Sequence, residues 1–293
     1  MKTGYGYRVF QVINYFFLAL CGLVTLVPFL YVILVSFTDA TEYMTSPIVI
    51  IPKHWSLASY EYIFSTSTFM RSMGVSAFLA IVGTACSLIV TSALAYAISR
   101  KRLKGRKFFQ VSILITMLFS AGMIPNFLLI DSLGLMNSIW SLIIPSLTSA
   151  WYVLLMKNFF SEIPDELEEA ARIDGCTDIG VFIKVILPVS TSALAAFGLF
   201  YAVGYWNTYF NAILYINNDA LRPMQVVLQL MLITSSTQMA DPSVAAMLES
   251  EANIPPQVIK MAAVVVSSLP IVMVYPFLQK YFIKGMMVGS VKG

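Results

Sequence analysis

Six long apolar stretches restrict what this chain can fold into. A helix needs about 20 apolar residues to cross a bilayer, and backbone polar groups in lipid must be satisfied within each segment. Only 11% of the residues are charged, against about 25% in soluble domains. The sequence therefore predicts an all-α membrane protein with six transmembrane helices. We place them near residues 11–36, 73–98, 108–130, 138–157, 183–215 and 258–280.

Three of these segments have features beyond their apolar length. The first has an apolar run from Val9 to Val35, longer than the ~7–15 apolar residues of a signal peptide, so we expect a retained helix. The fifth is longer than a bilayer requires, and we expect it to begin as a cytosolic helix that turns into the membrane near Pro188. In the third, Pro125-Asn126 after Gly122 fits either a break that lines a cavity or a packing kink.

The distribution of Lys and Arg predicts the orientation. Inner loops of membrane proteins are enriched in these residues. With both termini in the cytosol, every Lys and Arg lies on the inner side except Lys53, Arg71, Arg222 and Lys260. We therefore expect cytosolic N and C termini. The basic cluster at 99–107 is then expected to be a topogenic inner loop, without nucleic acid as a partner.

The membrane segments lack the groups that an independent carrier or an enzyme would need. Ionisable residues within a membrane mark ion pathways, and the interiors of these segments contain essentially none. The one histidine, His54, has no partner that would make a catalytic group. No G-x-x-x-x-G-K-[ST] loop is present, so a nucleotide that drives this chain would bind another subunit.

Polar and aromatic residues gather in the fifth segment. Tyr201, Tyr205 and Tyr209 recur every four residues, so we expect them to share one helix face. Together with Trp206 and Asn207 they would suit a sugar, which offers apolar C–H faces and many hydroxyls. The alternative is an aromatic belt at the membrane interface.

A polar, acidic stretch at 161–188 separates two apolar segments. Pro164 suits the first turn of a helix, and Gly175 suits a left-handed C-terminal stop. Thr177 or Asp178 can cap a second helix. We expect a short helix, a tight turn and a second helix that enters the membrane. Such an element would dock a soluble partner, although an ordinary solvated inner loop would have similar composition.

The same stretch resembles the coupling loop of type I ABC importer permeases, whose pattern is E-A-A-x3-G-x9-I-x-L-P. This chain supplies Glu169-Ala170-Ala171, Gly175 and Leu187-Pro188, with Val185 in place of Ile. The string EAARIDG resembles the carbohydrate branch, the maltose-transporter-like permeases. The run at 121–145 resembles the subgroup that serves oligosaccharides and polysaccharide fragments, and the ending at 289–293 is similar to that of the maltose-type second permease.

The resemblance implies a permease subunit of an ATP-driven sugar importer in the bacterial cell membrane. It implies one transmembrane domain over 1–293, with a core module at about 72–282, the coupling loop at 161–188 and a cytosolic tail at 281–293. The implied partners are a second permease, two cytosolic ATPase subunits, an extracellular solute-binding protein, an oligosaccharide and membrane lipid. ATP and magnesium would bind the ATPase subunits, leaving this chain without catalytic residues, cofactor or metal.

Two sets of contact residues follow from the resemblance. The ATPase-coupling set is Glu169, Ala170, Ala171, Asp174 and Gly175, of which the two alanines would let a partner approach closely. The set at the ATPase-contacting tail is Gly289, Ser290, Val291 and Lys292. An outer loop within 216–257 would reach toward the binding protein. An ABC permease for a peptide or amino acid, and an independent secondary carrier, remain as alternatives.

Overall fold

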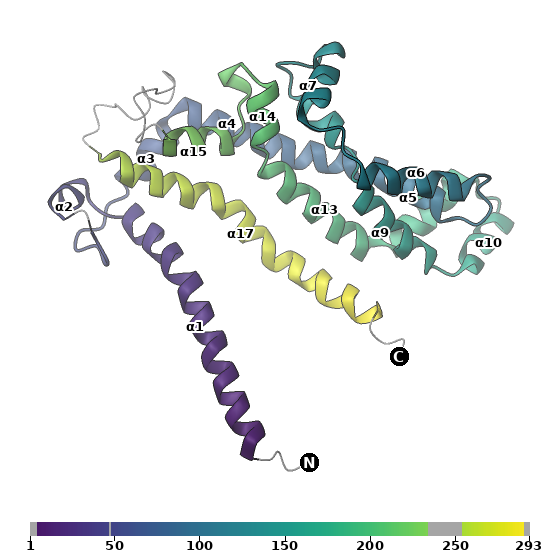
Figure 1. Cartoon of the computed structure of the whole chain (residues 1–293), viewed down its shortest axis with the longest axis horizontal. Helices are drawn as coiled ribbons and strands as arrows, with labels where there is room; N and C mark the ends of the chain where they lie inside the picture. Colours follow the sequence, from purple (N-terminus) through teal and green to yellow (C-terminus); the bar gives the residue numbers. More distant parts are fainter. Residues whose placement is uncertain (1–4, 47, 234–253, 290–293) are drawn as a thin grey trace. The chain divides into compact units, whose positions relative to one another are not determined.

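The computed structural model describes residues 5–46, 48–233 and 254–289 (Figure 1). Apart from a single β-bridge between Thr38 and Trp55, the regular structure of these residues is helical. The chain forms two compact units. One comprises Met1–Met70 and Leu230–Leu269, and the other comprises Arg71–Gln229 and Pro270–Gly293.

The first unit begins with a long apolar helix, α1 (Tyr5–Ser36), followed by α2 (Ala40–Thr45) and α3 (Ala58–Ser65). At 1.5 Å per residue α1 extends about 48 Å, more than the ~30 Å hydrocarbon core of a bilayer. Only 6% of its most apolar window is buried by the chain itself. Lipid or another protein must therefore cover this helix.

The segment after α1 is ordered by two carboxylates. The Asp39 side chain accepts the Thr41 N–H at 2.9 Å and caps α2. The Glu42 carboxylate accepts the backbone N–H groups of Lys53 at 3.0 Å and of His54 at 2.8 Å. These donors lower the pKa of the Glu42 carboxyl below its usual range. The segment therefore folds back on itself between α2 and α3.

In the second unit, one helical rod packs against two other helices. The rod consists of α4 (Ser67–Phe78), which starts in the first unit, the π-helical turn η1 (Leu79–Gly83) and α5 (Thr84–Ser99). It contacts α9 (Ala150–Ser161) and α13 (Thr191–Trp206). The core between them is made of apolar side chains from all three helices: Ala95, Ile98, Val153, Met156, Phe160, Ala193 and Phe197.

Shorter elements complete the second unit. They are α6 (Arg106–Leu118), α7 (Met123–Ser132), α8 (Trp140–Ile143), the 3₁₀ turn η2 (Ile144–Ser146), α10 (Asp165–Ile173), α11 (Asp178–Val181), the π-helical turn η3 (Phe182–Ile186), α12 (Leu187–Val189), α14 (Phe210–Tyr215) and the 3₁₀ turn η4 (Asp219–Leu221). Two helices reach into both units: α15 (Met224–Ile233) and α17 (Pro256–Gly289).

Three helical stretches in the described residues are long and apolar enough to cross a membrane. They are Phe10–Ser36, Ser67–Ser99 and Pro256–Pro276, which overlap the first, second and sixth predicted segments. Two bent pairs would raise the number to five: Arg106–Leu118 with Met123–Ser132, and Asp178–Val189 with Thr191–Trp206. The expected bend near Pro188 is confirmed, since the second pair turns by 84° at Ser190.

The third predicted segment is not one continuous helix. It breaks after Leu118, and α7 leaves α6 at 114° (Figure 1). The chain becomes extended at Phe119 and enters α7 through Gly122, whose φ of 88° lies in the region that favours glycine. Pro125 falls in the first turn of α7, where a missing N–H costs no helical bond. The break therefore precedes Pro125 and is not made by it.

The fourth predicted segment, 138–157, is also interrupted. It starts as α8 and η2, loses helical structure over 147–149, and resumes as α9 at Ala150. Pro145 lacks the N–H that a continuing α-helix would use. The interruption leaves Ser146, Thr148 and Ser149 beside α13, where they line a cavity.

A close approach between η1 and α13 holds the rod in place. A Cβ atom added to Gly83 would lie 2.7 Å from Cζ of Tyr205. The Tyr205 hydroxyl is tied to the Ser87 hydroxyl at 2.9 Å, and the Tyr201 hydroxyl to the Thr91 hydroxyl at 2.6 Å. Because these bonds fix the rings, neither tyrosine can move aside without losing a buried hydrogen bond.

We expect Gly83→Ala to destabilise the protein by about 1–3 kcal/mol, the usual cost of overpacking a core. The matched control is Gly74→Ala in α4, where an added Cβ meets nothing within 4 Å; this change should be neutral or slightly stabilising, because alanine favours helix. Thermal unfolding in lipid nanodiscs measures both. Equal midpoints for the two variants would contradict the tight contact.

Candidate functional site

The polar stretch at 161–188 forms the expected helix, turn and second helix. α10 carries acidic residues in its first turn and ends in a Schellman motif. The Gly175 N–H donates to the Arg172 carbonyl, and the Cys176 N–H donates to the Ala171 carbonyl, both at 2.9 Å. Gly175 has a φ of 83°, which confirms its role as the left-handed stop.

The second helix is capped by Thr177, whose hydroxyl accepts the Gly180 N–H at 3.2 Å. This bond decides between the two caps that the sequence allowed, Thr177 and Asp178. The helix then runs through η3 and α12 to the bend at Ser190. The turn thus connects α10 to α13 through the helical segment Asp178–Val189.

The predicted coupling residues divide between two faces of α10. Glu169, Ala170, Asp174 and Gly175 are exposed. Ala171 is only 8% exposed and packs into the core. The expectation that two alanines let a partner approach therefore applies to Ala170 alone. Ala171 sets the depth at which α10 lies on the core.

Sequence reasoning missed two exposed apolar residues beside this turn. Ile173 is 86% exposed and Ile179 is 71% exposed. Isolated exposed apolar residues are common on protein surfaces, but here they flank the tight turn at Gly175 on both sides. Their signal in the sequence was an isoleucine on each side of the short polar run at 174–178. Together with Glu169 and Asp174 they give the turn a mixed apolar and acidic surface.

The opposite face of α10 is charged and buried. Glu168 is 4% exposed, and its Oε1 lies 2.7 Å from Nη1 of Arg100 at the end of α5. Its Oε2 accepts from Arg172 Nη2 at 3.2 Å. The basic cluster that the sequence assigned to topology alone therefore also supplies a buried contact to α10.

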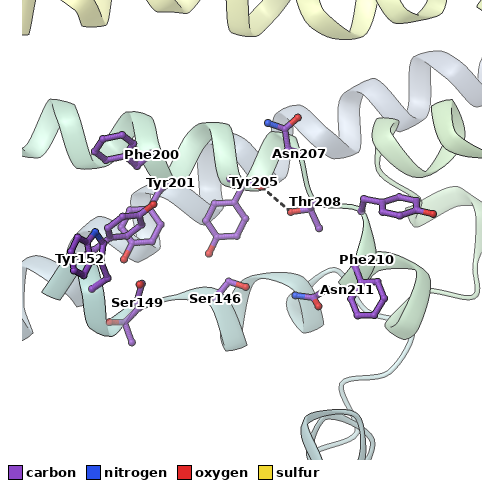
Figure 2. A pocket seen from close by; sticks show the side chains of 14 residues that line it. Ser146, Ser149, Tyr152, Phe200, Tyr201, Tyr205, Asn207, Thr208, Phe210 and Asn211 are labelled. Atoms are coloured by element: carbon purple, nitrogen blue, oxygen red, sulfur yellow. Dashed lines mark hydrogen bonds between the residues drawn. The ribbon is translucent and has the colours of Figure 1, made fainter. Parts of the chain in front are cut away.

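A second candidate site is a cavity of about 570 Å³ beside the end of α13 (Figure 2). Its lining mixes aromatic rings with hydroxyl and amide groups: Ser146, Thr148, Ser149, Trp151, Tyr152, Phe200, Tyr201, Gly204, Tyr205, Asn207, Thr208, Tyr209, Phe210 and Asn211. None of these lining residues is charged. Such a lining suits a neutral part of a ligand with many hydroxyl groups better than a charged group of a ligand.

The predicted aromatic residues do not share one helix face. α13 ends at Trp206 and α14 begins at Phe210, so Tyr209 lies between helices. Tyr201 and Tyr205 are almost fully buried, and their hydroxyls point toward the segment with Ser146 and Ser149 (Figure 2). The prediction that Tyr201, Tyr205 and Tyr209 share one helix face is wrong, because α13 ends before Tyr209. Tyr209 nevertheless lines the same cavity.

Trp206 and Asn207 lie differently from the expectation. Trp206 is buried and lines an apolar hollow with Ala77, Ala80 and Ile81, outside the aromatic cavity. Asn207 lines the cavity, and its Oδ1 accepts from Gln225 Nε2 at 3.2 Å. Asn207 is also the C-cap of α13. Of the two, only Asn207 borders the polar space.

Sequence reasoning missed one wall of this cavity. Ser146, Thr148, Ser149, Trp151 and Tyr152 come from the interruption before α9. The available signal was Pro145 followed by three hydroxyl residues within an otherwise apolar segment. In the part of the chain that the structure describes, no group of three His, Cys, Asp or Glu residues could hold a metal ion.

Residues 87–288 match the family model described as "binding-protein-dependent transport system inner membrane component". The chain belongs to this family. It is a transport subunit of the bacterial plasma membrane and not an enzyme.

Relatives share almost the full length of this chain. The polygalacturonan/rhamnogalacturonan transport system permease protein YtcP of Bacillus subtilis (strain 168) is 46% identical over 98% of this chain and 99% of its own. The arabinooligosaccharides transport system permease protein AraQ of Halalkalibacterium halodurans is 30% identical over 94% of each chain. A chain of a bacterial ABC transporter that imports the acidic polysaccharide alginate superposes with a TM-score of 0.88, at 31% identity over 96% of this chain and 99% of its own.

We expect Gly175 to tolerate asparagine better than valine. Asparagine visits the left-handed region with little cost, whereas a β-branched residue there costs about 1–2 kcal/mol or more. Gly175→Val should speed amide hydrogen exchange across α10 and α11, and Gly175→Asn should change it little. Equal exchange in both variants would show that the turn does not depend on its left-handed residue.

Proposed function

We propose that this chain is the membrane-spanning permease subunit of an ATP-driven importer of oligosaccharides. The observation that carries this proposal is the exposed α10 turn in a chain whose relatives over nearly its full length are sugar permeases. One transmembrane domain over 1–293 would contain a core module at about 72–282. The coupling loop at 161–188 belongs to that module, and a cytosolic tail at 281–293 follows it.

The proposed topology has six membrane crossings with both termini in the cytosol. The Lys and Arg distribution supports this orientation, because it places α10 and the basic segment at 99–107 on the same inner side. Contacts between these two segments agree with that placement, since Arg100 and Lys101 both approach Asp165. The interrupted segment at 138–157 would complete the six crossings.

The exposed face of α10 is the proposed dock for an ATPase. Glu169, Ala170, Asp174 and Gly175 would contact one of two cytosolic ATPase subunits, which bind ATP and magnesium. A second permease would complete the path, and an external solute-binding protein would deliver the sugar. Gly289 is the last residue of α17. Ser290, Val291 and Lys292 lie outside the described residues, as does 234–253 in the outer loop, so both contacts stay predictions.

The aromatic cavity is the proposed sugar path through this subunit. Aromatic faces can pack on the C–H faces of a sugar ring, while amide and hydroxyl groups exchange hydrogen bonds with its hydroxyls. Tyr209 and Asn211 are the better candidates for direct contact. The hydroxyls of Tyr201 and Tyr205 are committed to α5, so these two residues are expected to shape the cavity wall.

Glu169→Lys should uncouple sugar uptake from ATP hydrolysis, because it reverses a charge on the proposed dock. We expect uptake by the reconstituted importer to fall at least about fivefold, in the range of typical coupling energies. Glu162→Lys, a charge reversal at another exposed residue that precedes α10 and lies outside the proposed contact set, should leave uptake nearly unchanged. Normal uptake by Glu169→Lys would refute the docking role.

Tyr209→Ala should lower oligosaccharide uptake by about fivefold or more without loss of assembly, since loss of one well-placed binding contact costs about 1–2 kcal/mol. The control is Tyr15→Ala in α1, an exposed tyrosine that is not among the residues lining the cavity. Uptake of labelled oligosaccharides into proteoliposomes measures both. Full uptake by Tyr209→Ala would assign this ring to an interfacial belt.

A further inference from the structure

Among the Lys and Arg residues of the segment 99–107, Arg100 is the one that is almost completely buried, with 6% of its surface exposed. It follows the last residue of α5 and has an extended backbone conformation. A buried arginine is rare unless its charge is paired. A topogenic role would need only a charge in the inner loop, so the burial of this side chain requires another explanation.

The charge of Arg100 is paired with α10. Its Nη1 lies 2.7 Å from Oε1 of Glu168 and 3.6 Å from Oδ1 of Asp165. The first pair is enclosed on both sides, since the side chains are 7% and 6% exposed. It is a charge contact and not an aligned hydrogen bond. Water screens such an enclosed pair far less than a surface pair.

The other two guanidinium nitrogens of Arg100, Nη2 and Nε, fix the direction of its side chain. Nη2 donates to the Phe160 carbonyl near the end of α9, and Nε donates to the Ser99 hydroxyl at 2.8 Å. The Arg100 Cζ atom lies 5.2 Å from the centre of the Tyr96 ring, within reach of a cation–π interaction. One side chain therefore connects the ends of α5 and α9 with the buried face of α10.

A second set of charges, which is exposed at Arg102 and Asp178, extends the connection to α11. Arg172 bridges Glu168 at 3.2 Å and Asp178 at 3.6 Å. Arg102 lies 2.9 Å from Asp178. Both arms of the turn are thus tied to the segment after α5. The Arg102 pair is largely exposed and should contribute little, which makes it a suitable comparison for the buried pair.

We infer that Arg100 is a positioning residue for energy coupling: with Glu168 it holds α10 as a rigid extension of α5, so that a displacement of the exposed turn moves α5. This inference rests on the proposed function. The same α5 reaches the aromatic cavity, where Ser87 and Thr91 bind the hydroxyls of Tyr205 and Tyr201. About 20 Å of continuous helix separates Ser87 from Arg100.

The decisive variant removes both buried charges. Arg100→Met with Glu168→Met keeps long apolar side chains in place, and buried ion pairs replaced in this way often leave a fold stable. Arg100→Met alone would leave a buried carboxylate without its main partner and is expected to lower the yield of assembled importer. The comparison variant is Arg102→Met, which breaks only the exposed pair.

Two quantities are measured on the complete importer in nanodiscs or proteoliposomes: sugar transported per ATP hydrolysed, and the mobility of a spin label at Ile173→Cys. The label is placed in a chain in which Cys21, Cys86 and Cys176 are alanine. We expect the double variant to assemble, to show a more mobile label and to transport at least about fivefold less sugar per ATP. Arg102→Met should match the parent chain within about twofold.

Transport per ATP at the parent value in the double variant would overturn the inference. If the double variant does not assemble, Arg100→Lys provides the test, because it keeps the charge near Glu168 but loses the fork that reaches Phe160 and Ser99. We then expect a partial loss of sugar per ATP, and an unchanged ratio overturns the inference. Failure of the docking role is seen separately, as normal uptake by Glu169→Lys.

Discussion

The packing of α5 against α9 and α13 is the constraint on which the second unit depends. Apolar side chains fill the contact, and Gly83 lets the Tyr205 ring approach the backbone of η1. The hydroxyls of Tyr201 and Tyr205 find partners on α5, which satisfies polar groups that would otherwise be costly in an apolar surrounding. One helix pair thus combines close packing with buried hydrogen bonds.

This arrangement places α5 in contact with both candidate sites. Toward η1, Ser87 and Thr91 of α5 bind the hydroxyls of two tyrosines that line the aromatic cavity. At its other end, Arg100 forms an ion pair with Glu168 of α10. Packed helices shift as units more readily than they deform, because their interiors are close-packed. A displacement of the α10 turn is therefore expected to reach the cavity through α5, and also through the chain connection from α11 to α13 at the bend near Ser190.

Local chemistry made the α10 element predictable. A glycine stop, a Thr cap and an acidic first turn act within a few residues, so the sequence specified them directly. The cavity was only partly predictable. Its α13 wall could be proposed from Tyr201 and Tyr205, whereas its other wall comes from the interruption at 147–149, more than fifty residues earlier in the chain. Continuous hydropathy hid that interruption, because apolar composition does not reveal where a helix breaks.

By itself the sequence determined that this chain is helical, lies in the membrane and presents an acidic turn between two apolar segments. It did so because hydropathy, Lys and Arg asymmetry and cap residues are properties of single segments. Only the tertiary structure decided that Ala171 faces the core, that Trp206 lies outside the aromatic cavity and that Arg100 is buried against Glu168. Those outcomes depend on which helices meet, since burial and ion pairing arise from residues far apart in the chain.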